Sequence, residues 1–292
     1  MNSCHRLALG TVQFGIPYGV ANKSGQVNRD EVAKILNQAY ATGLDTIDTA
    51  IAYGQSEQRL GDIGIANWKV ITKLAAMPES VNNVRSWVKE SVSSSFKRLG
   101  VSRVRGLLLH HSNQLFAPQG ESLYQALNDL KEQDMVEKIG VSIYAPEELD
   151  AIWPRFKPDI VQSPFNVFDR RLAESGWLKR LHNSGTEIHV RSVFLQGLLL
   201  MERNNRPKYF NRWNLVWDQW HNWLDEQSIT SLQACLGFTK SQPEINRVVV
   251  GVDSLKQLQE IFTSFEAPTI DSPIVLMSKD IDLINPSRWE IS

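Results

Sequence analysis

Short apolar runs recur along the chain, and longer stretches with apolar residues at helical spacing separate them. The run at residues 104–109 shows no strict alternation of polar and apolar positions, which is typical of a strand buried on both faces of a parallel sheet. We predict strands at residues 6–9, 44–47, 69–72, 104–109, 136–141, 159–162, 186–190 and 247–250.

The intervening stretches are predicted as helices. In residues 81–99, for example, Val84, Val88 and Val92 recur on one face, and Gly100 follows as a terminator. Eight strands that alternate with helices indicate an α/β fold, a closed (β/α)₈ TIM barrel, and we expect one domain over residues 1–292. The predicted helices are residues 28–43, 56–65, 81–99, 123–132, a short one opened by Pro146, 172–183, 224–241 and 254–265.

Residues 201–221 are the least regular part of the chain. They combine Trp213, Trp217 and Trp220 with four basic residues, and a long loop in a compact domain is usually functional. The three tryptophans also have helical spacing, which equally predicts packing against the following helix. Both interpretations stay open, and residues 267–292 are expected to wrap around the barrel.

Charge and composition narrow the function. The formal net charge is −1, so nothing in the overall charge favours nucleic acid or an anionic membrane as a partner. The start of the chain does not resemble a signal peptide, and no apolar run approaches the ~20 residues of a membrane-spanning helix. Cys4 and Cys235 have no motif spacing and are expected to be reduced thiols, so we expect a cytoplasmic protein.

Polar residues follow three successive predicted strands. Asp48 and Tyr53 come after the second strand, Lys73 ends the third and His110 ends the fourth. The carboxyl ends of barrel strands meet at one rim, where such barrels place their chemistry. Each residue alone has a structural explanation, such as an ion pair or a half-buried rim aromatic, but together they favour a catalytic site. His111 lies outside this pattern, and the spacing of the histidines does not support a metal site.

Residues 43–61 resemble the signature of the aldo/keto reductases, and the resemblance extends from Leu7 to about Phe262. It implies an oxidoreductase that reduces an aldehyde or ketone, with Tyr53 as general acid, Lys73 as its tuning cation, Asp48 as the partner of the lysine and His110 as the group that orients the carbonyl. The matching residues are Gly43, Asp45, Asp48, Thr49, Ala50, Tyr53, Gly54, Ser56, Glu57, Leu60 and Gly61.

The same resemblance implies a nicotinamide cofactor, because no side chain donates hydride. No GxGxxG motif follows the first strand, so a doubly wound dinucleotide domain is not supported. Ser254 and Gln257 form an S-x-x-Q cap, and a helix N-terminus there would suit phosphate. The residues that the resemblance assigns to the cofactor are Gly10, Thr11, Asp48, Ser142, Gln162, Arg191, Ser192, Gln196, Gly197, Leu198, Gly251, Ser254 and Gln257.

Three positions depart from the family pattern. Ile143 follows Ser142 where an asparagine is common, and Arg191 stands where an aromatic residue often stacks on the nicotinamide. A guanidinium can also stack, or bind a carboxylate or phosphate. Gly251 and Gln257 replace basic residues at the adenine end, and Asp253 nearby would repel a 2′-phosphate. The resemblance predicts NADP(H), with NAD(H) as the alternative.

The expected partner is a small carbonyl compound, sugar-derived or carrying a carboxylate or phosphate. Its pocket is predicted to include Phe14, Tyr18, Phe165 and the tryptophan-rich stretch. Two other functions compete: a cofactor-binding regulatory or sensor protein of the same fold with little turnover, and a barrel isomerase or aldolase that uses Lys73 as a Schiff base. The sequence leaves the oligomeric state open.

Overall fold

Eight parallel strands close into a barrel in the computed structural model, which describes residues 3–290. Each strand pairs with its neighbours in chain order, and the first and last strands close the ring through Leu7–Val248 and Gly10–Gly251. This confirms the predicted fold. The strands are β1 (Leu7–Gly10), β2 (Thr46–Asp48), β3 (Lys69–Leu74), β4 (Val104–Leu109), β5 (Val136–Ser142), β6 (Ile160–Pro164), β7 (Glu187–Arg191) and β8 (Arg247–Gly251).

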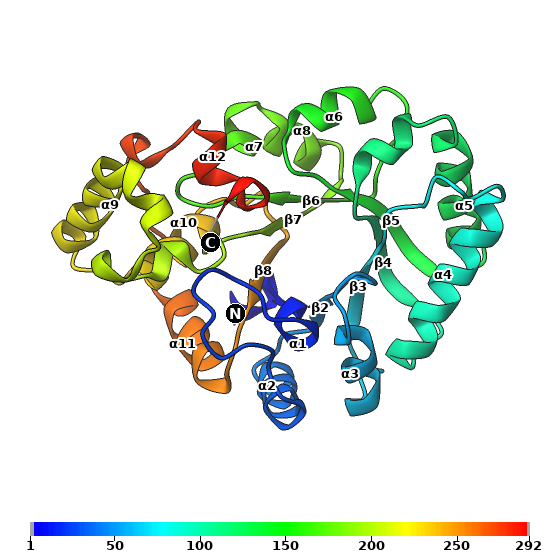
Figure 1. Cartoon of the computed structure of the whole chain (residues 1–292), viewed down its shortest axis with the longest axis horizontal. Coiled ribbons are helices and arrows are strands. Elements are labelled where there is room, and N and C mark those ends of the chain that lie inside the picture. Colours follow the sequence, from blue (N-terminus) through cyan, green and yellow to red (C-terminus); the bar gives the residue numbers. More distant parts are fainter. Residues whose placement is uncertain (1–2, 291–292) are drawn as a thin grey trace.

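Helices surround the barrel, as Figure 1 shows. Asn28 caps α2 (Arg29–Ala41) by accepting a hydrogen bond from the Glu31 amide (3.0 Å). The helices are α1 (Val12–Gly15), α2 (Arg29–Ala41), α3 (Ser56–Ile63), α4 (Val84–Leu99), α5 (Gly120–Glu132), α6 (Glu147–Ile152), α7 (Arg171–Glu174), α8 (Trp177–Asn183), α9 (Asn214–Gln227), α10 (Ser231–Lys240), α11 (Leu255–Glu266) and α12 (Ile281–Ile284).

Two predicted helices are each interrupted. The stretch 172–183 breaks at Gly176, whose φ of 79° is left-handed, giving α7 and α8. The stretch 224–241 breaks at Ser228, with φ of 53°, and Thr230 then starts α10 with a capping box to Gln233. The loop predicted at 201–221 is also wrong in part, because α9 already begins at Asn214.

The hydrophobic core lies mainly between the barrel and its helices. Inside the barrel, Ile71, Leu108 and Ile160 form a small separate layer, and Gly106 leaves room for the two isoleucines. Trp217 and Trp220 are buried against Phe168, so the tryptophans of α9 belong to the core.

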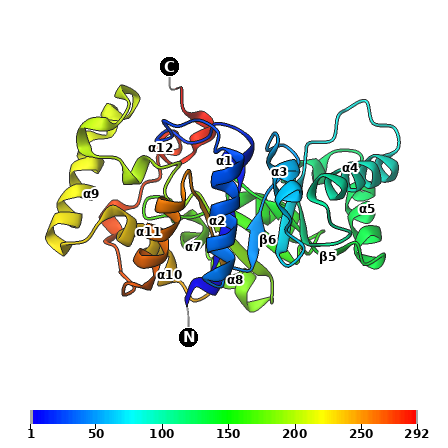
Figure 2. The ribbon, with the colours of Figure 1, turned by 90° about the horizontal axis from the view of Figure 1, so that it is seen from below.

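The two ends of the barrel differ. Figure 2 shows α1 and α12 together at one end, with the N-terminal end of the chain at the other. The helices within residues 3–290 are all too short or too polar to cross a bilayer.

Candidate active site

Four polar side chains meet at the carboxyl ends of neighbouring strands. Asp48 is the last residue of β2, Lys73 lies near the end of β3, and His110 directly follows β4. Tyr53 lies on the turn between β2 and α3. The structure therefore brings together the residues that the sequence placed at one rim.

Asp48 and Lys73 form a buried ion pair. Lys73 Nζ lies 2.6 Å from Asp48 Oδ1, and the two side chains are 1% and 5% exposed. Lys73 also donates to the Thr49 carbonyl (2.9 Å), and Gln162 Nε2 donates to the second Asp48 oxygen (2.6 Å). Burial opposes the charge on Lys73, but Asp48 and Tyr53 together outweigh burial, so the pKa of Lys73 lies above its ordinary value. The lysine is a fixed cation.

The lysine and a histidine flank the tyrosine. Lys73 Nζ lies 5.1 Å from the centre of the Tyr53 ring, and the His110 ring lies edge-on to it at 5.7 Å. Burial and the Lys73 charge lower the pKa of His110 to about 4, so its imidazole is neutral at pH 7. His110 Nδ1 is buried and has no hydrogen-bond partner in residues 3–290. His110 also lines the cavity at this rim.

The turn that carries Tyr53 packs tightly against α1. A Cβ on Gly15 would lie 1.6 Å from the Tyr53 carbonyl oxygen, and one on Gly54 would lie 2.7 Å from the Gly15 oxygen. Ser56, at the start of α3, donates to the Thr11 carbonyl (2.9 Å). Backbone contacts that only glycine permits therefore fix the position of Tyr53.

Glu57 ties the same turn to the barrel. Its side chain is buried and accepts hydrogen bonds from Thr72 (2.8 Å), Ser95 (2.6 Å) and Arg98 (2.6 and 2.9 Å), which lie on β3 and α4. A Cβ on Gly61 would lie 2.0 Å from the Arg98 carbonyl oxygen, so α3 and α4 approach closely. Several residues of the signature therefore have a structural role, because they fix α3 against the barrel and α4.

A cavity of about 580 Å³ opens at this rim, with Tyr53 and His110 on its wall. Lys73 lies beneath the wall, and two residues that the sequence assigned to a cofactor do not line it: Leu198 is fully buried and Ser254 caps α11. The assigned residues that do line the cavity are Gly10, Thr11, Asp48, Ser142, Gln162, Arg191, Ser192, Gln196, Gly197, Gly251 and Gln257.

The cavity wall has features that fit an extended dinucleotide. Gln162 Oε1 is buried without a hydrogen-bond partner in residues 3–290, which leaves an acceptor for an amide group. Ser192, Leu195 and Gln196 all have positive φ values of 50–57°. Such backbone is uncommon outside glycine and concentrates at binding sites.

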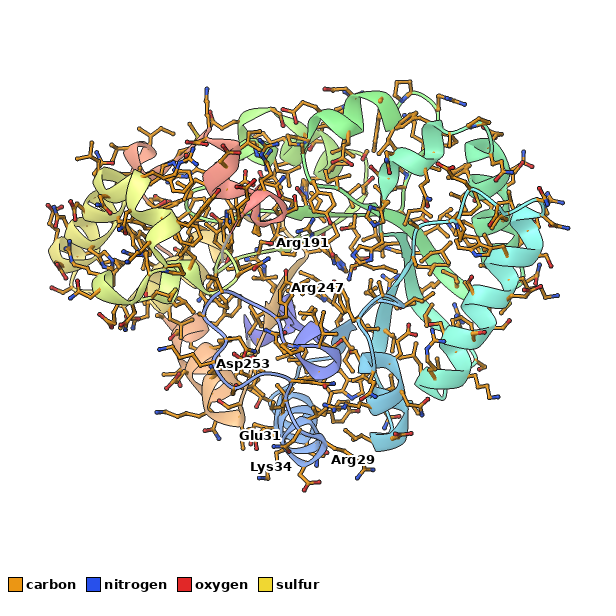
Figure 3. The ribbon with its side chains drawn as sticks, in the orientation of Figure 1. Arg29, Glu31, Lys34, Arg191, Arg247 and Asp253 are labelled. Carbon is orange, nitrogen blue, oxygen red and sulfur yellow. The ribbon has the colours of Figure 1, made fainter. Side chains whose placement is uncertain are left out.

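The far end of the cavity, beside α11, is acidic. Glu31 of α2 accepts a hydrogen bond from the Leu255 amide (2.8 Å), the first residue of α11, and this contact lowers the pKa of Glu31. Ser254 accepts from the Gln257 amide (3.3 Å). Two of the N–H groups at this helix start, those of Leu255 and Gln257, are therefore already bonded within the protein. Asp253 and Glu260 line the cavity here, and Figure 3 shows Glu31 and Asp253 on the side of α2 and α11.

Other parts of the predicted pocket lie elsewhere. Phe14 and Phe165 are buried in the core, where Phe165 stacks on Phe238, whereas Tyr18 does line the cavity. His111 is exposed and is not part of the wall. Among residues 3–290, no three His, Cys, Asp or Glu side chains are placed to hold a metal.

The C-terminal segment supplies a wall that the sequence did not indicate. Residues 284–287 line the cavity. Their position is secured from the tryptophan-rich region: Trp213 Nε1 donates to Asp280 (2.8 Å), and Trp289 packs edge-on against Phe210. No local motif marks these residues, because their role depends on a contact with a segment about 70 residues earlier.

The chain matches a known protein family. The model of the aldo/keto reductase family matches residues 6–277. The chain is 22% identical to an NADH-specific methylglyoxal reductase of Escherichia coli, over 93% of each chain. It is 23% identical to a protein of Arabidopsis thaliana named a probable voltage-gated potassium channel subunit beta, over 92% of each. Among solved structures, aldo-keto reductase AKR11C1 from Bacillus halodurans in its holo form is similar in fold, with a TM-score of 0.73, 19% identity and coverage of 91% and 88%.

Proposed function

The chain belongs to the aldo/keto reductase family of NAD(P)H-dependent oxidoreductases, and we propose on this premise that it reduces the carbonyl group of a small aldehyde or ketone with Tyr53 as general acid. One observation carries the proposal. The buried Lys73–Asp48 pair lies beneath the Tyr53 ring and beside a neutral His110, at the wall of a cavity of about 580 Å³.

Each of the four residues has its own role in the proposed reaction. Tyr53 donates a proton to the oxygen of the carbonyl as that oxygen gains negative charge. The Lys73 ammonium stabilises the phenolate that remains, and Asp48 holds the ammonium in place. His110 is neutral and donates one N–H to the same oxygen, which orients the substrate. A nicotinamide bound in the cavity would supply the hydride.

Different residues of the cavity wall suit different parts of the cofactor. Ser142 and the unpartnered Gln162 Oε1 suit the carboxamide of the nicotinamide. The backbone turn at residues 192–197 suits the pyrophosphate. Gly10, Thr11, Gly251 and Gln257 line the remaining wall.

We further propose that NAD(H) is preferred to NADP(H), although the family resemblance alone favoured NADP(H). A 2′-phosphate would add about two negative charges at a part of the wall that carries Asp253 and Glu260. A ribose hydroxyl, in contrast, can donate to a carboxylate. The NADH-specific relative from Escherichia coli agrees with this choice.

Fluorescence titration with NADH and NADPH tests the cofactor preference. We expect NADH to bind at least about tenfold more tightly, because one like-charge contact costs roughly 1–2 kcal/mol in a partly buried site. Asp253→Ser removes one of these charges and should narrow the difference between the two affinities. Glu244→Gln removes the same charge ahead of β8, at the opposite end of the barrel, and should leave the gap unchanged. Equal affinities in the wild type would refute the preference.

Turnover tests the reductase itself. With NADH and a panel of aldehydes that includes methylglyoxal, Tyr53→Phe should lower kcat by roughly 10²–10⁴-fold, while the Kd of NADH stays within a factor of two or so. Tight NADH binding without turnover of any substrate would favour the alternative, a cofactor-binding regulatory or sensor protein. Borohydride trapping of a substrate on Lys73 would favour an aldolase, but the buried charge pair argues against a free amine.

A further inference from the structure

One guanidinium on the cavity wall has no carboxylate partner among residues 3–290. Arg191 ends β7 and is half-buried. Its Nη2 donates to the Ile143 carbonyl (3.0 Å), its Nη1 to Ser192 Oγ (3.3 Å), and the group lies 4.9 Å from the centre of the Tyr144 ring. All three partners are neutral. Figure 3 shows Arg191 near the centre of the barrel mouth.

The other arginine on this wall is balanced. Arg171 makes two hydrogen bonds to the buried carboxylate of Asp169, each 2.8 Å long. Its positive charge is therefore neutralised within the protein. Arg191 has no such partner, and a partly desolvated cation gains stability when an anion approaches.

Arg191 lies at the reactive end of the cavity. Its charge contributes to the lowered pKa of His110, after burial and the charges of Lys73 and His111. The acidic side chains Asp253 and Glu260 lie at the other end, beside α11. An anion drawn to Arg191 would therefore be placed within reach of the residues proposed for the chemistry.

We propose that Arg191 determines substrate specificity by binding an anionic group, a carboxylate or a phosphate ester, of the carbonyl substrate. The inference rests on the proposed reductase function and names its substrate class: oxo acids and phosphorylated aldehydes. The contacts to Ile143, Ser192 and Tyr144 hold the guanidinium plane, and its remaining N–H groups match the two oxygens of a carboxylate or phosphate.

Two substrates of nearly equal shape test the charge. 4-Carboxybenzaldehyde is an anion and 4-nitrobenzaldehyde is neutral. We expect the ratio of their kcat/KM values to fall about tenfold or more in Arg191→Gln, since a charge-assisted hydrogen bond contributes roughly 1.5–3 kcal/mol. Arg191→Lys should recover part of the ratio. Lys256→Gln, an exposed cation on α11 outside the cavity wall, removes the same charge and should leave the ratio unchanged.

Glyceraldehyde 3-phosphate and glyceraldehyde form the second pair, which separates a phosphate from a carboxylate as the preferred anion. A tenfold fall in either ratio supports the proposal. Ratios that stay the same in the wild type and Arg191→Gln overturn it. If Arg191→Gln instead weakens NADH binding in fluorescence titration and alters neither ratio, the guanidinium serves the cofactor, and the proposal is also overturned.

A binding measurement keeps this test independent of turnover. Calorimetric titration of the protein saturated with NADH compares benzoate with the neutral benzamide. We expect benzoate to lose about tenfold or more in affinity relative to benzamide in Arg191→Gln. Arg191-dependent benzoate binding without turnover of any aldehyde would refute the reductase and retain the anion site. Benzoate binding that does not depend on Arg191, in an enzyme that reduces aldehydes without a charge preference, would do the reverse.

Discussion

The buried pair of Lys73 and Asp48 is the residue-scale feature on which the proposed chemistry depends. Both charges are withdrawn from water, and such a pair is stable only while each partner retains its counter-charge and hydrogen bonds. The ion pair therefore contributes a fixed position and a positive charge to the site more than it contributes to the stability of the fold. Separating these two contributions requires variants that remove one charge or both.

Asp48→Asn should lower the free energy of unfolding by roughly 3–5 kcal/mol, because the ammonium is left buried without its counter-charge. Asp48→Asn combined with Lys73→Met removes both charges and should recover much of that loss, yet remain inactive. Urea denaturation and NADH oxidation measure the two effects. A double variant no more stable than Asp48→Asn would contradict the account.

At the scale of elements, local pattern predicted the barrel and local backbone conformation altered its helices. The eight apolar runs correspond to eight strands. Such a run is recognised from neighbouring residues alone, so its prediction does not depend on distant contacts. The breaks at Gly176 and Ser228 depend on left-handed backbone. For a serine, the sequence alone does not reveal that conformation.

Contacts between distant elements explain the remaining differences at the site. Glu31 lies in the first turn of α2, but its carboxylate accepts a hydrogen bond from the first residue of α11, 224 positions along the chain. Residues 284–287 line the cavity because Asp280 and Trp289 are bound by the region before α9. The residues at the strand ends can be predicted from the order of the elements along the chain. Contacts between distant segments, such as these, are known only once the barrel has closed.

The packing of α1 against the Tyr53 turn gives an element-scale prediction. Gly15→Ala places a methyl group where the Tyr53 carbonyl lies, so the turn must move. We expect kcat to fall on the order of tenfold to a hundredfold, since small displacements of a reacting group carry such effects. Steady-state kinetics measure it. Gly237→Ala, at a helical position on α10 where the added methyl group meets only the Ile270 side chain at 3.1 Å or more, is the control and should retain turnover.

For the whole molecule, ionisable groups away from the rim link stability to pH. At the opposite end of the barrel, burial opposes the charge on Glu187, but hydrogen bonds from His189 and Lys138 outweigh it and hold its pKa well below the ordinary value. Burial and the Arg206 charge lower the pKa of His221 to about 4. Glu187 stabilises the fold above its unfolded pKa, and this contribution is lost as pH falls below it.

His221 acts in the same direction. Between its unfolded pKa of ~6.5 and its folded pKa of about 4, the unfolded chain binds the extra proton, so stability rises with pH through this window. His221→Gln retains an acceptor for Arg206 and removes the titration. We expect its free energy of unfolding to depend less on pH from 6.5 to 4.5, by up to ~1 kcal/mol per unit after allowance for partial exposure. Urea titrations across this range check the slope, and parallel curves would count against it.

The clamp formed by Ser56, Glu57 and Gly61 has a consequence for evolution and for classification. These residues fasten α3 to the barrel, and the Ser56 amide also donates to the Tyr53 carbonyl (3.0 Å), so they hold the backbone of the tyrosine and not its phenol. A relative in which another side chain replaces Tyr53 would keep the clamp and fold as before. It would also still match nearly all of the family signature. These signature residues therefore indicate the fold, and the proposed activity has to be tested at Tyr53 itself.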